Sequence, residues 1–255
     1  MQPVDGRKER WRSHRAARRE EFVDAALRAL AAHGPELRVA RVAATAGVSK
    51  PVLYRHFADK DDLLAALHAR LTAMLMERLA PAIDPAAAPT ARIRGAIDAL
   101  FSLLDEHPNL YRLVSRTLLT GPDSGRQGVR SGKALAAQTL TQVFDAYLYA
   151  FGLDTRGAEP MAHAVVGMVH NTAEWWLEHG AAGRAETVDR LAEAVWDCFD
   201  GFLRRRGVTV DPGTPLRPED ALAARAGSAY AAGPVAAPAS PAAGSVTAPA
   251  AAPHP

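Results

Sequence analysis

The sequence predicts an all-α protein of about nine helices, with a small three-helix unit at the N-terminus and a larger helical unit after it. Three observations lead to this fold class. Apolar residues recur at intervals of three and four along most of the chain, which is the spacing of one face of a helix. No segment shows the alternation of apolar and polar residues that a half-buried strand needs. The 255 residues are also rich in alanine, with 48% hydrophobic and 6% aromatic residues.

The first expected helix covers residues 18–32. Its buried face would consist of Phe22, Ala26, Ala29 and Leu30. The preceding residues, 1–17, are polar and basic and show no apolar stripe. We therefore expect a basic N-terminal arm there and not a packed helix.

Residues 39–60 are expected to form two short helices joined by a tight turn. The first helix would have one apolar face, formed by Val39, Val42, Ala43 and Ala46. Gly47 would end it, because glycine is favoured where the chain must turn sharply. Ser49 is a good N-cap for the second helix, and Pro51 suits its first turn, where a missing N–H does no harm.

The second of these helices has two different faces. Leu53 and Phe57 are expected to be buried, whereas the other face carries donors and cations and no acid, namely Lys50, Tyr54, Arg55 and His56. A basic helix held by a glycine turn against a partner helix has the geometry of a helix-turn-helix reader in the major groove of DNA. The alternative is a helical hairpin with a solvated basic face. The basic arm would either reach phosphates or the minor groove, or be a disordered leader.

A longer helix is expected from residue 59 or 60 to about residue 79. Asp61 and Asp62 suit the positive N-terminal end of its dipole. Leucines keep it apolar along its length, at Leu63, Leu64, Leu67, Leu71, Leu75 and Leu79. A break rich in proline and alanine follows at residues 81–89. The first unit, the helix-turn-helix DNA-binding domain, is therefore expected at residues 18–80.

The second unit is expected at residues 90–206. Its helices would cover residues 90–106, 110–119, 133–151, 158–178 and 186–206, with a glycine-containing loop at residues 120–132. After Gly207 the composition changes to alanine, proline, glycine, serine and threonine, from which no core can be built. Residues 207–255 are therefore expected to form a disordered tail.

Charge is distributed unevenly along the chain. The net charge is +2, but residues 1–60 carry 13 basic and 7 acidic side chains, a balance of +6, and the remainder has a balance of −4. A basic head on a near-neutral body is the electrostatic footprint of a DNA-binding protein. No apolar run is long enough for a membrane span, and no secretory signal is evident, so we expect a cytoplasmic protein. The single cysteine, Cys198, fits a reducing compartment.

The segment AxxAGVSKPVLYRHFADKDDLL, residues 43–64, resembles the DNA-binding signature of TetR-type transcriptional regulators. The resemblance implies a homodimer that binds a palindromic double-stranded operator, and a body that encloses a small-molecule effector. In that family the helix after the signature moves the head when the body binds its ligand. Beyond the signature, the resemblance rests only on the number and spacing of helices.

Ten residues are the predicted DNA contacts. Tyr54, His56 and Lys60 match positions at which the family usually holds phosphates, whereas Arg55 is suited to pair with a guanine. Lys50 and Pro51 depart from the small residues that are common there, so the operator sequence cannot be transferred. The full set is Arg38, Arg41, Thr45, Ser49, Lys50, Pro51, Tyr54, Arg55, His56 and Lys60.

Two further sets of residues follow from the resemblance. The wall of an effector cavity is expected from Phe101, Leu104, Tyr111, Val114, Phe144, Tyr147, Met168 and Trp175. Their scarcity of charge suggests an apolar or acyl-like ligand, and the alternative is that they form plain core. The dimer interface is expected from the last two long helices, through Ala164, Gly167, Asn171, Leu191, Val195, Cys198, Phe199 and Phe202.

Catalysis, metals and cofactors find little support. His163, His170 and Glu174 share one helical face, but no second cluster completes a ligand set, so no metal site is predicted. No motif of a hydrolase, metalloprotease or phosphate loop is complete. We therefore expect a transcriptional regulator without enzymatic activity or cofactor, in the simplest case a ligand-released repressor. The alternative is an architectural or partner-regulated DNA-binding protein without a small-molecule inducer.

Overall fold

The computed structural model describes residues 6–82, 84, 86–120, 123–179 and 183–223, with side chains for all of these except 6–13 and 116–132. Within this part the chain forms helices and no strand, so the predicted all-α class is confirmed. None of the described helices combines the length and apolar content needed to cross a bilayer. The labelled helices are α1 (Gly6–His33), α2 (Val39–Thr45), α3 (Lys50–Tyr54), α4 (Lys60–Ala82), α5 (Pro89–Glu106), α6 (Pro108–Thr120), α7 (Asp123–Phe151), α8 (Ala158–His179) and α9 (Arg184–Arg204).

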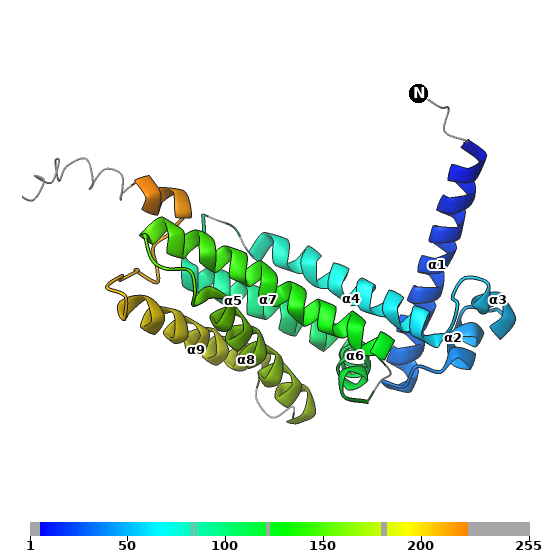
Figure 1. Ribbon diagram of the computed structural model, residues 1–255. Coiled ribbons are helices and arrows are strands. Elements are labelled where there is room, and N and C mark those ends of the chain that lie inside the picture. Colours follow the sequence, from blue (N-terminus) through cyan, green and yellow to red (C-terminus); the bar gives the residue numbers. More distant parts are fainter. Residues whose placement is uncertain (1–5, 83, 85, 121–122, 180–182, 224–255) are drawn as a thin grey trace, which may run out of the picture.

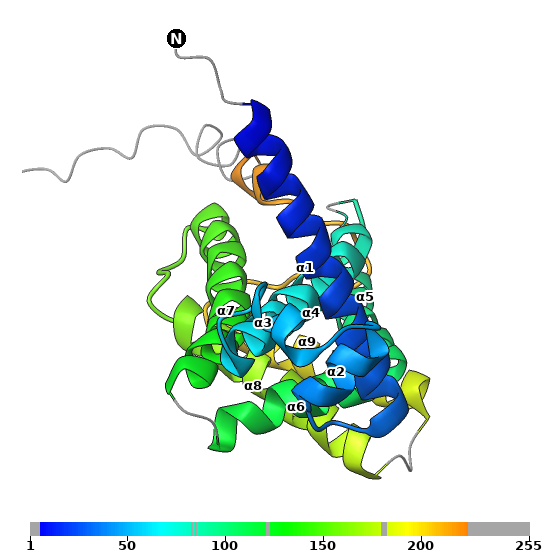
Figure 2. The same cartoon turned by 90° about the vertical axis from the view of Figure 1, so that its right-hand side faces the viewer.

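The helices form a head at one end and an elongated body (Figure 1). In the head, α1, α2, α3 and the start of α4 gather around one apolar cluster. Its most deeply buried large side chains include Phe22, Leu53, Phe57, Leu63 and Leu67. Figure 2 shows the head from its outer end, with α2 and α3 nearest the viewer. The short helix α3 therefore lies at the surface of the head and not between the head and the body.

The body contains α5 to α9 and most of α4. The long helices α4, α5 and α7 run side by side, whereas α6 is seen nearly end-on (Figure 1). A second apolar cluster joins α5, α6, α8 and α9 around Phe101, Leu104 and Val188. The helix α6 contributes to both clusters, because Leu110 and Val114 lie in the head cluster and Tyr111 lies in the body cluster. The head and the body therefore share α6 as a common packing element.

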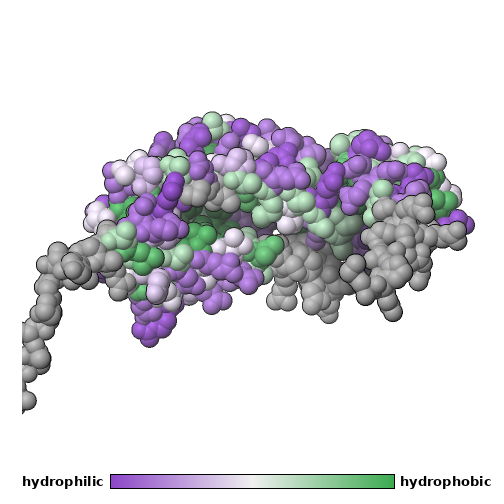
Figure 3. Space-filling model, turned by 90° about the horizontal axis from the view of Figure 1, so that it is seen from above, coloured by the Kyte–Doolittle hydropathy of each residue, from purple (hydrophilic) through white to green (hydrophobic). Residues whose placement is uncertain are grey.

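The outer surface of the body is poor in charge along α7. The exposed residues of this helix between positions 134 and 149 are all uncharged, and Leu135, Val143 and Tyr149 are large and apolar or aromatic. Met76 on α4 is exposed as well. Apolar patches are visible between polar margins when the body is seen from above (Figure 3). This surface differs from the basic surface predicted for the head.

Three helix boundaries differ from the prediction. The first helix begins at Gly6 and not at residue 18, since residues 7–17 contain no glycine or proline and a packed helix extends easily through polar helix formers. The helix α7 begins at Asp123, so most of the predicted loop at 120–132 is helical, because glycine lowers helix propensity without excluding a helix. The helix α4 includes Pro81 and ends at Ala82, so the predicted break begins only after Ala82.

The segment after α9 also differs from the prediction. Residues 208–223, which we call the C-terminal strap, leave α9 and cross α5 and α7, and residues 218–223 form a short helical turn. Val210 is buried, Oγ1 of Thr90 donates to the carbonyl of Pro212 over 2.7 Å, and the hydroxyl of Tyr147 donates to the carbonyl of Leu216 over 2.8 Å. A buried valine and two hydrogen bonds thus hold part of the predicted disordered tail on the body, and residues 224–255 lie outside the described residues.

Candidate nucleic-acid interface

The turn between α2 and α3 has the geometry expected from its glycine. Gly47 adopts a φ of 67°, and the amide of Val48 after it donates to the carbonyl of Ala43 over 2.9 Å. This closes α2 and aims the chain into α3. Leu53 and Phe57 are 0% and 1% exposed, as predicted, and anchor α3 and the turn after it in the head cluster.

The opposite face of α3 is open to solvent. Lys50, Pro51, Tyr54 and Arg55 are exposed, and Tyr54 keeps 44% of its surface exposed although it is aromatic. Exposed aromatic and basic side chains side by side on one helix are suited to contact bases and phosphates. Of the ten predicted contacts, eight are exposed and two, Arg41 and His56, are partly buried.

Ser49 takes the N-cap position of α3 with extended backbone, but its hydroxyl makes no capping hydrogen bond. The reason lies in the two amides that a cap would serve. Pro51 has no N–H, and the amide of Val52 donates to the backbone carbonyl of Ser49 over 3.0 Å. The predicted side-chain cap is therefore wrong, and the hydroxyl of Ser49 remains exposed beside Lys50.

His56 does not act as a cation on the outer face. Its ring lies 5.2 Å from that of Phe22 on α1, and its Nδ1 is buried without a hydrogen-bond partner among the described residues. Burial and then the nearby Arg15 and Arg18 lower the pKa of His56. A neutral ring packed on α1 serves to place the turn after α3 and does not add positive charge.

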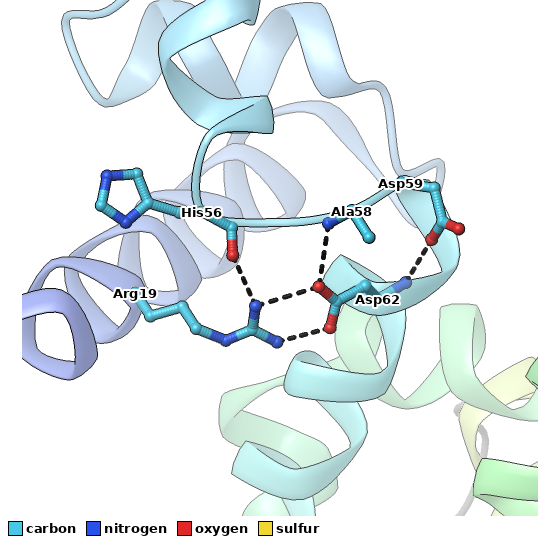
Figure 4. A network of polar contacts seen from close by, with 5 residues as sticks. All are labelled: Arg19, His56, Ala58, Asp59 and Asp62. Carbon is cyan, nitrogen blue, oxygen red and sulfur yellow. Dashed lines mark hydrogen bonds and ion pairs between the residues drawn. The ribbon is translucent and has the colours of Figure 1, made fainter. Parts of the chain in front are cut away.

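A polar network lies directly behind α3 (Figure 4). Nη1 of Arg19 on α1 donates to the carbonyl of His56 over 2.6 Å and to Oδ2 of Asp62 over 3.0 Å, while Nη2 donates to Oδ1 of Asp62 over 2.5 Å. The hydrogen bond from Arg19 lowers the pKa of Asp62. Arg19 could not be predicted from sequence patterns, because only the fold brings α1 and the start of α4 together.

The remaining predicted DNA contacts lie around α2 and at the start of α4. Arg38 is exposed and forms an ion pair with Glu36, with 2.6 Å between Nη2 and Oε2. Thr45 at the end of α2 and Lys60 at the start of α4 are also exposed. Arg38 and Thr45 thus lie at the two ends of α2, and Lys60 begins α4, the two helices that border α3 in the chain.

The eight residues predicted to form an effector wall have several different environments. Phe101, Leu104 and Tyr111 are buried in the body cluster with Met168 packed against them, whereas Val114 lies in the head cluster. Three others lie elsewhere: Phe144 packs edge-on against Phe199 at 4.5 Å, Tyr147 bonds to the strap, and Trp175 is 47% exposed and stacks on His179. Four of the eight thus lie in or against the body cluster, and the common wall stays a prediction.

A shallow pocket of about 340 Å³ lies between α8 and α9. Only two predicted wall residues, Met168 and Trp175, contribute to it. The other lining residues are Thr172, Glu186, Thr187, Arg190, Leu191 and Ala194. The lining is mainly apolar, although Glu186 and Arg190 contribute to it, and the pocket is open to solvent.

The residues predicted for a dimer interface have two different environments. Ala164 and Asn171 on α8 are exposed, and Gly167 is partly buried. On α9, however, Leu191 and Val195 are 5% and 2% exposed and belong to the core of the body. Partly buried residues make up the rest of the set, namely Cys198, Phe199 and Phe202. Leu191 and Val195 are therefore occupied within one chain and leave little surface for a partner.

His170 on α8 packs against and bonds to its neighbours. The hydroxyl of Tyr111 lies 2.5 Å from Nδ1 of His170, and Nε2 of His170 lies 3.1 Å from Oε1 of Glu174. Burial and then Lys133 lower the pKa of His170. Among the residues with described side chains, no group of three potential ligands could hold a metal ion.

Comparison with sequence families gives two matches that together span the head and the body. Residues 22–67 match the family of bacterial regulatory proteins, tetR family, and residues 78–207 match a tetracyclin repressor-like C-terminal domain. An uncharacterized HTH-type transcriptional regulator of Mycobacterium tuberculosis is 30% identical over 205 residues, which cover 80% of this chain and 86% of that protein. The HTH-type transcriptional activator FasR of Mycolicibacterium smegmatis is 30% identical over 140 residues, 54% of this chain and 62% of that protein.

Solved structures have the same fold. A tetR-family transcriptional regulator from Streptomyces coelicolor matches with a TM-score of 0.60 and 21% identity, covering 84% of this chain and 99% of that one. The transcriptional regulator FadR from Bacillus subtilis, in complex with stearoyl-CoA, matches with a TM-score of 0.57 and 22% identity, covering 69% of this chain and 96% of that one.

Proposed function

Because the chain belongs to the TetR family of DNA-binding transcriptional regulators, we propose that it binds a palindromic operator as a homodimer and represses transcription until a small apolar or acyl-like ligand releases it. In this proposal residues 18–80 bind DNA and residues 90–206 bind the ligand and dimerise. A regulator of this kind acts at the chromosome, in the cytoplasm.

The observation that carries the proposal is the outer face of α3. Lys50, Tyr54 and Arg55 are exposed together, while Leu53 on the other face of the same helix is fully buried. The helix is thus held firmly by its apolar side and presents donors and cations to solvent. Two such heads related by a two-fold axis would contact two half-sites about one helical turn of DNA apart, which is why we propose a dimer and a palindrome.

The shared packing of α6 supports release by a ligand in the body. Leu110 on α6 is buried in the head cluster, Nδ2 of Asn109 donates to the carbonyl of Leu30 on α1 over 2.9 Å, and Tyr111 faces the body cluster. A ligand that shifts α6 in the body would therefore shift the head as well. It needs only a higher affinity for the arrangement that does not fit DNA.

The acyl character of the ligand rests on one structural neighbour, FadR, whose structure holds stearoyl-CoA. A thermal-shift titration with stearoyl-CoA, with free coenzyme A as the control, tests this part. Ligand at a hundredfold its dissociation constant stabilises the folded protein by about 2.7 kcal/mol. Stabilisation by both compounds alike would argue against recognition of an acyl chain.

A second candidate is an architectural DNA-binding protein without an inducer. The scattered positions of the predicted wall residues favour it, because Phe101, Leu104 and Val114 are packed in two separate cores. Selection of bound fragments from random DNA by the full-length protein separates the candidates. A two-fold symmetric site supports the dimeric regulator, and enrichment of no sequence supports the architectural protein.

A further inference from the structure

We infer that Arg19 and Asp62 are positioning residues for DNA binding, because their contact fixes α3 to the first turn of α4 so that both move as one unit. Neither residue belongs to the predicted contact set. The inference rests on the proposed binding of an operator by α3. Arg19 and Asp62, which lie behind α3, would thereby orient the exposed residues of α3.

The guanidinium group of Arg19 has the geometry to join several elements. Arg19 projects from α1, and its two terminal nitrogens donate to both oxygens of Asp62 and to the carbonyl of His56 (Figure 4). Its Cζ also lies 4.2 Å from the centroid of the Phe57 ring. One side chain thus contacts α1, the turn after α3 and the start of α4 together. A planar fork with several donors is required for this, and a lysine cannot reproduce it.

The carboxylate of Asp62 makes a further contact within the same network. Oδ2 of Asp62 accepts from the amide of Ala58 over 3.0 Å, in addition to its bonds with Arg19. The amide of Asp62 donates in turn to Oδ1 of Asp59 over 2.8 Å. Asp62 therefore ties the turn at residues 56–59 to the helix α4 through its own side chain. Lys60, a predicted phosphate contact, lies between Asp59 and Asp62 in the chain.

The helix α3 depends on this tie because it is short. It has only five residues, and an isolated helix of this length is not stable by its own hydrogen bonds. Its direction depends on what holds its two ends. Gly47 and the closing bond of Val48 set the start, and the network of Arg19 and Asp62 sets the end. Loss of the network leaves Leu53 buried but frees the turn that leads to α4.

The Arg19–Asp62 pair contributes more to the orientation of α3 than to the stability of the fold. The side chains of Arg19 and Asp62 are 33% and 32% exposed, and ion pairs with this much contact with water contribute little to folding. Both terminal nitrogens of Arg19 are engaged by protein atoms, so they are not free to hold a phosphate. The main effect of the pair is therefore on the orientation of α3.

The substitution Asp62→Asn provides a test by the sign of its effect. Removal of an acid near the DNA should strengthen binding by simple electrostatics, even from a position behind α3. Positioning predicts the opposite, namely weaker binding to the selected operator. Glu36→Gln is the matched control, because Glu36 is also paired with an arginine, Arg38, but joins no separate elements. We expect Glu36→Gln to bind as tightly as the wild type or more tightly.

The decisive readout is the ratio of operator affinity to non-specific DNA affinity. A variant that is merely less folded loses both affinities by the same factor, so its ratio does not change. A misaligned α3 loses base contacts first, and the ratio should fall by about tenfold, as when one base contact is lost. Arg19→Lys keeps the charge but not the fork, and we expect the same fall in ratio.

Three outcomes are distinguishable. A reduced ratio in both Asp62→Asn and Arg19→Lys, with Glu36→Gln unchanged or tighter, supports the inference. An unchanged ratio in Asp62→Asn, or full affinity in Arg19→Lys, overturns it while the proposed function stands. If the wild type itself shows no preference for any site, the proposed function is overturned, and the inference with it.

Discussion

The head and the body are built from the same kind of element but expose different surfaces. In the head, α2 and α3 have seven and five residues, and the outer face of α3 carries Lys50, Tyr54 and Arg55. In the body, α7 has 29 residues, and its exposed positions between 134 and 149 carry no charge. The head presents donors and cations outward on a short helix, whereas the exposed side of α7 in the body is uncharged over these positions.

This difference shows where each part is sensitive to change. A short helix such as α3 depends on its anchors, so a single buried residue or a single ion pair decides how it is placed. A long helix such as α7 is held along its whole length, and loss of one contact is shared among many. Four predictions test this comparison, in order of decreasing expected effect.

The largest effect is expected for Phe57→Ala in the head. The ring is 1% exposed and packs edge-on against Phe22 at 6.4 Å, and truncation of a buried phenylalanine costs about 3–5 kcal/mol. Phe101→Ala, which is 0% exposed in the body, is the matched variant with a similar cost. Limited proteolysis should cleave the head of the first variant while its body persists. Identical cleavage patterns in both variants would mean that head and body unfold as one unit.

A smaller effect on the free energy of unfolding is expected from the protonation of His68. This residue lies on α4, the helix that runs from the head into the body. Burial lowers the pKa of His68 to about 4, and its Nε2 has no hydrogen-bond partner among the described residues. The unfolded chain takes up this proton near pH 6.5 and the folded chain near pH 4, so stability is present above pH 6.5 and is lost as pH falls between these values. The loss for this one group amounts to about 3 kcal/mol.

The substitution His68→Leu isolates this contribution. Chemical denaturation at a series of pH values between 7 and 4 should show a shallower loss of stability in the variant than in the wild type. Other buried histidines such as His170, whose pKa is also lowered, remain in both proteins and cancel in the comparison. Equal losses in the two proteins would contradict the assignment of this proton to His68.

The outer face of α3 should give effects of about 1–3 kcal/mol in DNA binding for each contact removed. Arg55→Ala should relax sequence preference, and Lys50→Ala should alter it. Tyr54→Ala and Lys60→Ala should instead weaken binding to all sequences, and loss of the charge of Lys60 should reduce the slope of log affinity against log salt by about 1. Unchanged affinity in all four variants would rule out this face as the DNA contact.

The part of the molecule that could be predicted from the sequence is the part fixed by neighbours in the chain. Gly47, Pro51, Leu53 and Phe57 lie within about ten residues, so local turn chemistry and helix periodicity determine their positions. Arg19 and Asp62 could not be paired in this way, since they lie 43 residues apart and meet only in the fold. The same holds for Val114, whose periodicity predicts burial but cannot tell which of two cores it enters.

The C-terminal strap makes contacts that the sequence could not predict, because the residues concerned lie far apart in the chain. It also gives the smallest predicted effect. Thr90 and Pro212 are 122 residues apart, and the composition after Gly207 gave no sign of packing. Tyr147→Phe removes a hydroxyl that donates to the carbonyl of Leu216 and accepts from Nη2 of Arg92 over 2.6 Å. Since Arg92 still lies 3.3 Å from that carbonyl, the cost should be about 1 kcal/mol, measured by denaturant unfolding.

A double-mutant cycle shows whether this hydroxyl acts through the strap. In a chain that ends at Gly207, Tyr147→Phe should lose most of its effect, because only the contact of the hydroxyl with Arg92 remains. In a chain that ends at Ala223 it should cost as much as in the full-length protein. Loss of the effect in the shorter chain would assign Tyr147 to holding the strap. If the cost persists without the strap, the hydroxyl is satisfied inside the body, and Tyr147 regains its place among the candidate ligand contacts.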